Sequence, residues 1–227
     1  ALSVGSPVAH GPFAQALITV LPLRDDITAL LTAHQSADEN TWSEIRAKAK
    51  RDLGIHSGHK VILVFGGSQG SQAINSTIEN TRELIKERPI TIIHSVGAAN
   101  NVPTSDGQYL AFPYIENMAT AYLASDLVIA RSGAITCSEV SALGKYALFI
   151  PLPIGNGEQS VNADHLVEMG RARVLEQSSF TASWLLDNMD SMLATSDQFS
   201  DLPNFSDLEA AAKIVALAEH QLSAGER

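Results

Sequence analysis

The stretch at 126–153 most strongly constrains what this chain can fold into. It holds an apolar run with β-branched residues at 127–130, a short turn, a helical segment with small side chains at 134–143, and a second apolar run at 147–150. This pattern predicts strand, turn, helix and strand. A buried strand that leads through such a helix into another buried strand is the βαβ unit of a parallel sheet. We therefore expect an α/β fold with a parallel sheet.

The rest of the chain repeats this alternation. Further apolar runs stand at 60–65, 90–93, 109–112 and 173–175. With the first two strands they predict about six parallel strands, flanked by helices on both faces. We expect a polar loop at 152–160, a helix at 161–169 and a last helix at 206–222. Residues 1–19 have little periodicity and predict a connecting segment that leads into a strand at 16–20.

Length and composition limit the classes of protein that this chain can be. With 227 residues and 45% hydrophobic content, it can bury the core of one sizeable domain. A net charge of −10 disfavours a nucleic-acid or anionic-membrane surface for the chain as a whole. The single cysteine, Cys137, cannot form an internal disulfide, which suits a reducing cytosol. No apolar run approaches the ~20 residues of a spanning helix, no signal peptide is evident, and a start at Ala1 rather than methionine is what we expect of a fragment.

Two polar residues of the central stretch stand out. Arg131 lies beside a predicted helix N-terminus, where a cation is disfavoured unless an anion such as phosphate binds there. The alternative is a surface arginine paired with a nearby carboxylate. Glu139 lies in an otherwise small and apolar helix. It either faces solvent or accepts hydrogen bonds from sugar hydroxyls, and the pattern alone leaves both interpretations open.

A glycine-rich segment, GGSQGS at 66–71, follows a predicted strand and opens a helix. Such a loop suits close backbone approach to a phosphate or a sugar. It is not the phosphate loop of NTPases, which needs Lys-Ser/Thr after its last glycine. It is not the dinucleotide fingerprint either, because His94 and Ser95, not an acid, follow the next predicted strand. A tight packing turn remains the alternative.

The adjacent acids Asp25 and Asp26 resemble a metal-binding pair only superficially. No third carboxylate or histidine stands at ligand spacing, whereas acids in the first turn of a helix match the helix dipole. We expect them to cap a helix, and we expect no metal site.

Five motifs together resemble the donor half of the bacterial MurG family. They are GGSQGS (66–71), HSVG (94–97), PYIENMATAY (113–122), DLVIARSGAITCSEV (126–140) and IPLPIGNGEQSVNA (150–163). The forms NGEQ and LPLR look like actinobacterial members, and the resemblance covers roughly residues 20 to 220. That family transfers N-acetylglucosamine (GlcNAc) from UDP-GlcNAc to undecaprenyl-diphospho-muramoyl-pentapeptide (lipid I), and so makes lipid II for peptidoglycan.

The resemblance implies a GT-B fold, in which two Rossmann-like domains face a cleft. This chain resembles only the C-terminal domain: residues 1–19 would be the linker or the end of a missing N-terminal domain, and 20–227 the domain that binds UDP-GlcNAc. Lipid I and the membrane would be contacted only through the missing domain, on the cytoplasmic face of the plasma membrane. UDP-GlcNAc is the donor substrate, and no cofactor or metal is implied. The helix at 206–222 could support a dimer.

The resemblance also assigns roles to residues. The diphosphate should be contacted by Arg24, by Ser68 of the glycine-rich loop, and by the helix N-terminus at Gly133, Ile135 and Thr136, with Arg131 beside it. Gln69 of the same loop should also bind the substrate. Uracil should meet the backbone of Ile115 in a pocket shaped by Tyr114. Glu139 should bind the ribose hydroxyls, Glu158 and Gln159 should read the GlcNAc ring, and Asn162 should support their loop. No catalytic residue is expected, because the motif that carries the proposed base belongs to the missing domain.

Two positions depart from the family pattern: Val20 stands where glycine is usual, and Glu158 where glutamine is frequent. A carboxylate can accept hydrogen bonds from sugar hydroxyls but cannot donate. We expect the chain to bind the donor and not to turn it over alone. Three alternatives remain, namely a natural stand-alone donor subunit that needs an acceptor-domain partner, an isomerase of the UDP-GlcNAc 2-epimerase type and, lowest, a nicotinamide oxidoreductase. No catalytic motif of such an isomerase is found.

Overall fold

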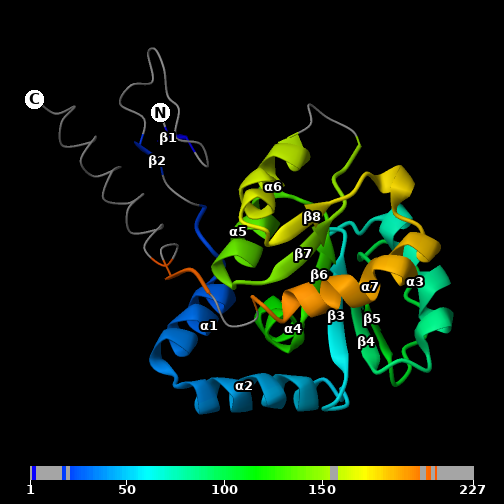
Figure 1. Cartoon of the computed structure of the whole chain (residues 1–227), viewed down its shortest axis with the longest axis horizontal. Helices are drawn as coiled ribbons and strands as arrows, with labels where there is room; N and C mark the ends of the chain where they lie inside the picture. The colour runs from blue at the N-terminus through cyan, green and yellow to red at the C-terminus, as the bar shows by residue number, and fades with distance from the viewer. Residues whose placement is uncertain are drawn as a thin grey trace, which may run out of the picture.

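A single parallel sheet forms the centre of the molecule (Figure 1). The computed structural model describes residues 2–3, 17–18, 21–153, 158–199, 203–205 and 208. The six strands are β3 (Lys60–Phe65), β4 (Ile90–Ser95), β5 (Tyr109–Phe112), β6 (Leu127–Ala130), β7 (Tyr146–Phe149) and β8 (Ala172–Val174). All neighbours pair in parallel, in the order β5-β4-β3-β6-β7-β8. The predicted α/β class is confirmed.

The strand order reverses between β3 and β6. The chain places the second and third strands of the sheet on one side of β3 and the later three on the other, which is the Rossmann order. Ligands of such sheets bind beyond the carboxyl ends of the strands at this switch point. The glycine-rich loop follows β3, and the turn at Arg131 follows β6, so the fold brings both segments to that point.

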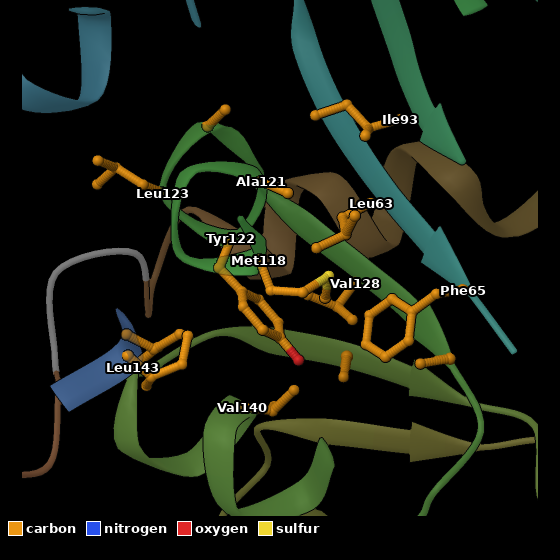
Figure 2. Close-up of a cluster of buried hydrophobic side chains, with 14 of the residues drawn as sticks. Leu63, Phe65, Ile93, Met118, Ala121, Tyr122, Leu123, Val128, Val140 and Leu143 are labelled. Atoms are coloured by element: carbon orange, nitrogen blue, oxygen red, sulfur yellow. The ribbon is translucent and has the colours of Figure 1, made fainter. Parts of the chain in front are cut away.

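Helices cover both faces of the sheet because its strands are apolar on both sides. One face packs against α1 (Asp25–Ser36), α2 (Glu39–Asp52), α4 (Met118–Ala124), α5 (Ala134–Ala142) and α6 (Glu158–Glu168). The other packs against α3 (Gln72–Arg82), the short 3-10 turn η1 (Glu83–Ile85) and α7 (Ala182–Ser196). Within β3, Leu63 belongs to the first cluster and Val64 to the second. Figure 2 shows part of the first cluster, around Tyr122 and Phe65.

Several element boundaries differ from the sequence predictions, most of them by one residue. Helix α6 begins at Glu158, not at 161, so Glu158 and Gln159 lie in its first turn rather than in a loop. Strand β4 extends to Ser95. The expected cap at Asp25 and Asp26 is wrong, because the N-cap of α1 is Arg24 and the two acids lie in the first turn. Asp26 Oδ2 instead accepts a hydrogen bond from the amide of Ala119 in α4 at 3.1 Å.

The ends of the chain are described only in part. A two-residue pair, β1 (Leu2–Ser3) with β2 (Leu17–Ile18), is parallel, and β2 falls within the strand predicted at 16–20. The helix predicted at 206–222 lies outside the described residues, apart from residue 208. None of the described helices is both long and apolar enough to cross a bilayer.

Candidate functional site

Arg131 lies at the switch point between β3 and β6 and forms hydrogen bonds to the surrounding loops. Its Nη1 donates to the carbonyl oxygens of Ile150 and Pro151, both at 2.9 Å. Its Nη2 donates to Ser71 Oγ at 2.7 Å and to Gln177 Oε1, in the 3-10 turn η2 (Gln177–Ser179), at 2.6 Å. The side chain is buried, and burial lowers the pKa of Arg131. The guanidinium therefore joins the loops that follow β3, β6 and β7.

These bonds correct both sequence interpretations of Arg131. All four Nη hydrogens point to neutral acceptors, so the Nη groups are not presented to an anion. The surface ion pair is wrong as well, since the residue is buried. Through its Nη groups, Arg131 therefore holds neighbouring loops of the site together.

The N-terminus of α5 is open at the same edge of the sheet. Its N-cap is Gly133, which supplies no side-chain acceptor, and Ile135 in the first turn is 57% exposed. The first amides of a helix lack intrahelical partners and carry partial positive charge. Ser132 Oγ, just before the cap, is buried without a hydrogen-bond partner among the described residues. With the partly exposed Thr136, this helix end is suited to an anion.

Helix α6 holds the turn that precedes α5. Asn162 Nδ2 donates to the carbonyl oxygen of Ser132 at 3.0 Å. Asn162 was predicted to support the loop that carries Glu158 and Gln159; the structure shows it bonded to the turn before α5 instead. Gln159 Oε1 accepts from the amide of Leu152 at 2.9 Å, and Glu158 is exposed. Of the residues between Leu152 and Glu158, the structure describes only residue 153.

The glycine-rich loop packs closely against the turn that follows β4. Gly70 has φ +74°, and a Cβ at this position would lie 1.9 Å from the carbonyl oxygen of Val96. A Cβ at Gly97 would lie 2.4 Å from the backbone of Gln69. The packing interpretation of the glycines is thus confirmed. Ser68 and Gln69 are exposed at the outer side of the loop, which leaves their side chains available to a ligand.

Glu139 is buried and held between two partners. Its Oε1 lies 2.9 Å from Arg24 Nε, and its Oε2 accepts a hydrogen bond from the Tyr122 hydroxyl at 3.0 Å. The solvent-facing interpretation of Glu139 is therefore wrong. Burial raises the pKa of Glu139, against the opposing effects of Arg24 and the Tyr122 hydrogen bond.

Arg24 and Asp26 connect this carboxylate to the start of α4. Arg24 is the N-cap residue of α1, and its Nε lies 3.6 Å from Asp26 Oδ1. Asp26 Oδ2 in turn accepts a hydrogen bond from the Ala119 amide. Among the described residues, no cluster of three His, Cys, Asp or Glu side chains could hold a metal ion.

The segment before α4 carries the residues predicted to meet a base. Tyr114 is 49% exposed, whereas Ile115 is partly buried against the first-face cluster. Neither the amide nor the carbonyl of Ile115 has a backbone hydrogen bond to another described residue. A backbone donor and acceptor side by side in this way can pair with an edge of a base.

Sequence reasoning missed two residues of this arrangement, Tyr122 and Ser71. From α4, the Tyr122 hydroxyl bonds to Glu139 of α5, and the backbone amide of Ala119 bonds to Asp26 of α1. The available signal was the single tyrosine in the otherwise non-aromatic helix α4. A separate hollow of about 370 Å³, lined by Asn75, His94 and Tyr109 among others, lies outside this group of residues.

Comparisons with known proteins agree with this geometry. The sequence model of the glycosyltransferase family 28 C-terminal domain matches residues 61–220. The UDP-N-acetylglucosamine–N-acetylmuramyl-(pentapeptide) pyrophosphoryl-undecaprenol N-acetylglucosamine transferase of Mycolicibacterium vanbaalenii is 37% identical over 78% of this chain and 43% of its own length. The enzyme of the same name from Corynebacterium glutamicum is 37% identical over 74% of this chain and 48% of its own length. The chain thus spans about half the length of the curated relatives it matches.

Solved structures give the same result. The crystal structure of Acinetobacter baumannii MurG superposes with a TM-score of 0.61 at 26% identity, over 77% of this chain and 53% of that one. A glycosyltransferase of kitacinnamycin matches with a TM-score of 0.59 at 18% identity, over 73% of this chain and 43% of that one, which shows the fold alone. The resemblance to the C-terminal half of MurG and the GT-B type of fold are confirmed, and the chain belongs to the glycosyltransferase family 28 C-terminal domain family.

Proposed function

We propose that this chain is the donor-binding part of an inverting glycosyltransferase that transfers GlcNAc from UDP-GlcNAc to undecaprenyl-diphospho-MurNAc-pentapeptide. The observation that carries the proposal is the placement of a buried carboxylate, Glu139, on the same short helix as an open N-terminus at Gly133. A helix N-terminus attracts a diphosphate, and a carboxylate accepts hydrogen bonds from a vicinal diol. A nucleoside diphosphate carries both groups, so one such ligand could meet both the N-terminus and Glu139 of this helix.

The remaining predicted residues support the same ligand. Ser68 and Gln69 offer exposed polar groups after β3, and Ile115 offers an amide and a carbonyl that bond to no backbone group of the described residues. Gln159, in the first turn of α6, has an amide nitrogen for the sugar. The related enzymes named above are N-acetylglucosamine transferases, which favours UDP-GlcNAc over other nucleotide sugars.

The proposed chemistry divides between two domains. Displacement at the anomeric carbon needs a base on the acceptor hydroxyl and electrostatic support for the departing UDP. The α5 N-terminus and Arg24 supply the second, and we assign the base to an N-terminal domain that precedes residue 20. In this proposal residues 1–19 are the linker and 20–227 the donor domain, and no cofactor or metal takes part. Lipid I and the cytoplasmic membrane surface are contacted through the other domain.

Calorimetric titration of the chain with UDP-GlcNAc, UDP, UDP-GalNAc and NAD tests the proposal. We expect both UDP and UDP-GlcNAc to bind, UDP-GalNAc to bind more weakly than UDP-GlcNAc, and NAD not to bind. With a lipid I analogue the chain alone should release no UDP, whereas a protein that includes the acceptor domain should. Equal binding of NAD, or no binding of any uridine ligand, would contradict the proposal.

A further inference from the structure

Tyr122 places a polar atom inside an apolar cluster. The side chain is fully buried, and its ring meets that of Phe65 edge-on, with 6.0 Å between centroids and an angle of 89° between planes. Figure 2 shows the ring beside Met118 and the oxygen directed toward Val140 of α5. Packing on all sides prevents the ring from turning away. The position of the hydroxyl is therefore set by the core.

Within the described part of the chain, Glu139 is the hydrogen-bond partner of this hydroxyl. Burial raises the pKa of Tyr122 well above its ordinary value, so the phenol stays protonated and donates. A hydroxyl buried without such a bond would destabilise the fold. The core thus presents one fixed donor to one oxygen of the Glu139 carboxylate.

The two partners of Glu139 differ in how far their side chains can move. The Arg24 side chain is 37% exposed at the start of α1, whereas Tyr122 is enclosed. A ligand can therefore draw Arg24 away from Glu139 but cannot displace Tyr122. Each carboxylate oxygen has about two acceptor sites, so a carboxylate that keeps its tyrosine bond still has room for two sugar hydroxyls.

We propose that Tyr122 is a positioning residue that holds the Glu139 carboxylate in the orientation needed to accept both hydroxyls of a vicinal diol. The inference rests on the proposed function, since the diol is that of the ribose of a uridine nucleotide. Tyr122 itself touches no ligand. It acts through Glu139 alone.

The test compares UDP with 2′,3′-dideoxy-UDP, which lacks the diol. Tyr122→Phe removes the hydroxyl and keeps the ring. We expect it to weaken UDP about tenfold, because the carboxylate loses a charge-assisted hydrogen bond that fixes it. Binding of the dideoxy compound should not change. Tyr146→Phe is the matched control, since Tyr146 is a buried tyrosine in the cluster on the other face of the sheet, and it should change neither affinity.

The pH profile gives a second readout that a purely structural role would not move. The Tyr122 hydrogen bond lowers the pKa of Glu139 against the effect of burial. Without it the carboxylate should protonate at higher pH, so the acid limb of UDP affinity should move upward in Tyr122→Phe and stay in place in Tyr146→Phe.

The outcomes separate this inference from the proposed function. A wild-type chain that binds no uridine nucleotide would overturn both. A wild-type chain that binds UDP and the dideoxy compound equally would overturn the inference and leave the proposed function standing. Wild-type preference for UDP that Tyr122→Phe retains would overturn the inference alone. If Tyr122→Phe does not fold, Glu139→Asp decides, because it keeps the charge but draws the carboxylate back from Tyr122. It should lose the preference for the diol, and a retained preference would overturn the positioning role.

Discussion

Arg24 Nε lies 2.9 Å from Glu139 Oε1, so two residues predicted to bind different parts of one ligand are paired with each other. The Glu139 side chain is 4% exposed and that of Arg24 37%. A diphosphate that attracts Arg24 would free one carboxylate oxygen for the ribose. The ion pair therefore neutralises the buried carboxylate in the absence of nucleotide. When the nucleotide binds, we expect the diphosphate to pair with Arg24 and the ribose hydroxyls to take the place of Arg24 at Glu139.

Glu139→Ala should weaken UDP and UDP-GlcNAc by the same factor. Both ligands carry the ribose, and loss of charge-assisted hydrogen bonds to it costs roughly 1.5–3 kcal/mol of binding free energy. Calorimetry on both ligands measures this. Glu168→Ala, an exposed site at the end of α6, is the charge-matched control and should leave both affinities unchanged. If UDP binds as tightly to Glu139→Ala as to wild type, Glu139 is not the ribose residue.

Gln159→Ala should weaken UDP-GlcNAc and leave UDP nearly unchanged. The Gln159 carbonyl oxygen is occupied by the Leu152 amide, which leaves the amide nitrogen to donate to the sugar. Loss of one such bond costs about 1 kcal/mol. Gln159→Glu sharpens the comparison, because it keeps an acceptor for Leu152 and removes only the donor. Both variants should show the same selective loss, and an equal effect on UDP would place the sugar elsewhere.

The sheet could be predicted because its signal is local. The apolar runs at 60–65 and 109–112 coincide with β3 and β5, since buried parallel strands read as continuous apolar segments bounded by polar turns. The start of α6 was missed because the sequence around Glu158 and Gln159 is polar and follows glycine. Its first turn lacks the apolar periodicity on which a helix prediction depends.

The site was predictable in position but not in contacts. Arg131 was expected beside a helix N-terminus and lies there, yet its bonds to Ser71 and Gln177 join residues distant in sequence. The burial of Glu139 likewise depends on Arg24 and Tyr122, which only the folded chain brings together. Periodicity reports which face of an element is buried, and it carries no information on such partners.

Gly70→Ala should destabilise the chain much more than Gly170→Ala. Both glycines have positive φ, +74° and +70°, so both substitutions incur the left-handed strain of about 1–2 kcal/mol. A Cβ at Gly170 meets nothing within 4 Å, whereas one at Gly70 would lie 1.9 Å from the Val96 carbonyl oxygen. Relief requires the two loops to separate, which we expect to add roughly 2 kcal/mol or more. Urea unfolding of the two variants measures the difference, and equal losses would mean that the loops can move apart freely.

His94 should make the chain less stable as the pH falls from neutral. Its ring lies between the Tyr109 hydroxyl, at 2.8 Å, and Asn75 Oδ1, at 3.1 Å. Burial lowers the pKa of His94 from 6.5 to about 4. Between these values the unfolded chain binds a proton that the folded chain excludes, so the free energy of unfolding falls with falling pH, by about 2 kcal/mol at pH 5. The contribution is complete above the unfolded pKa and lost through the window from 6.5 down to 4.

Urea unfolding at pH 7, 6 and 5 tests this assignment with two variants. His94→Gln removes the titrating ring, so its free energy of unfolding, although lower at pH 7, should fall about 2 kcal/mol less between pH 7 and 5 than that of wild type. His165→Gln, at an exposed position of α6, should follow the wild-type curve. A wild-type slope in His94→Gln would mean that His94 takes up its proton inside the fold. The hollow beside Asn75 would then admit the water needed to solvate the charge, and the Tyr109 hydroxyl would turn to present its oxygen to the ring.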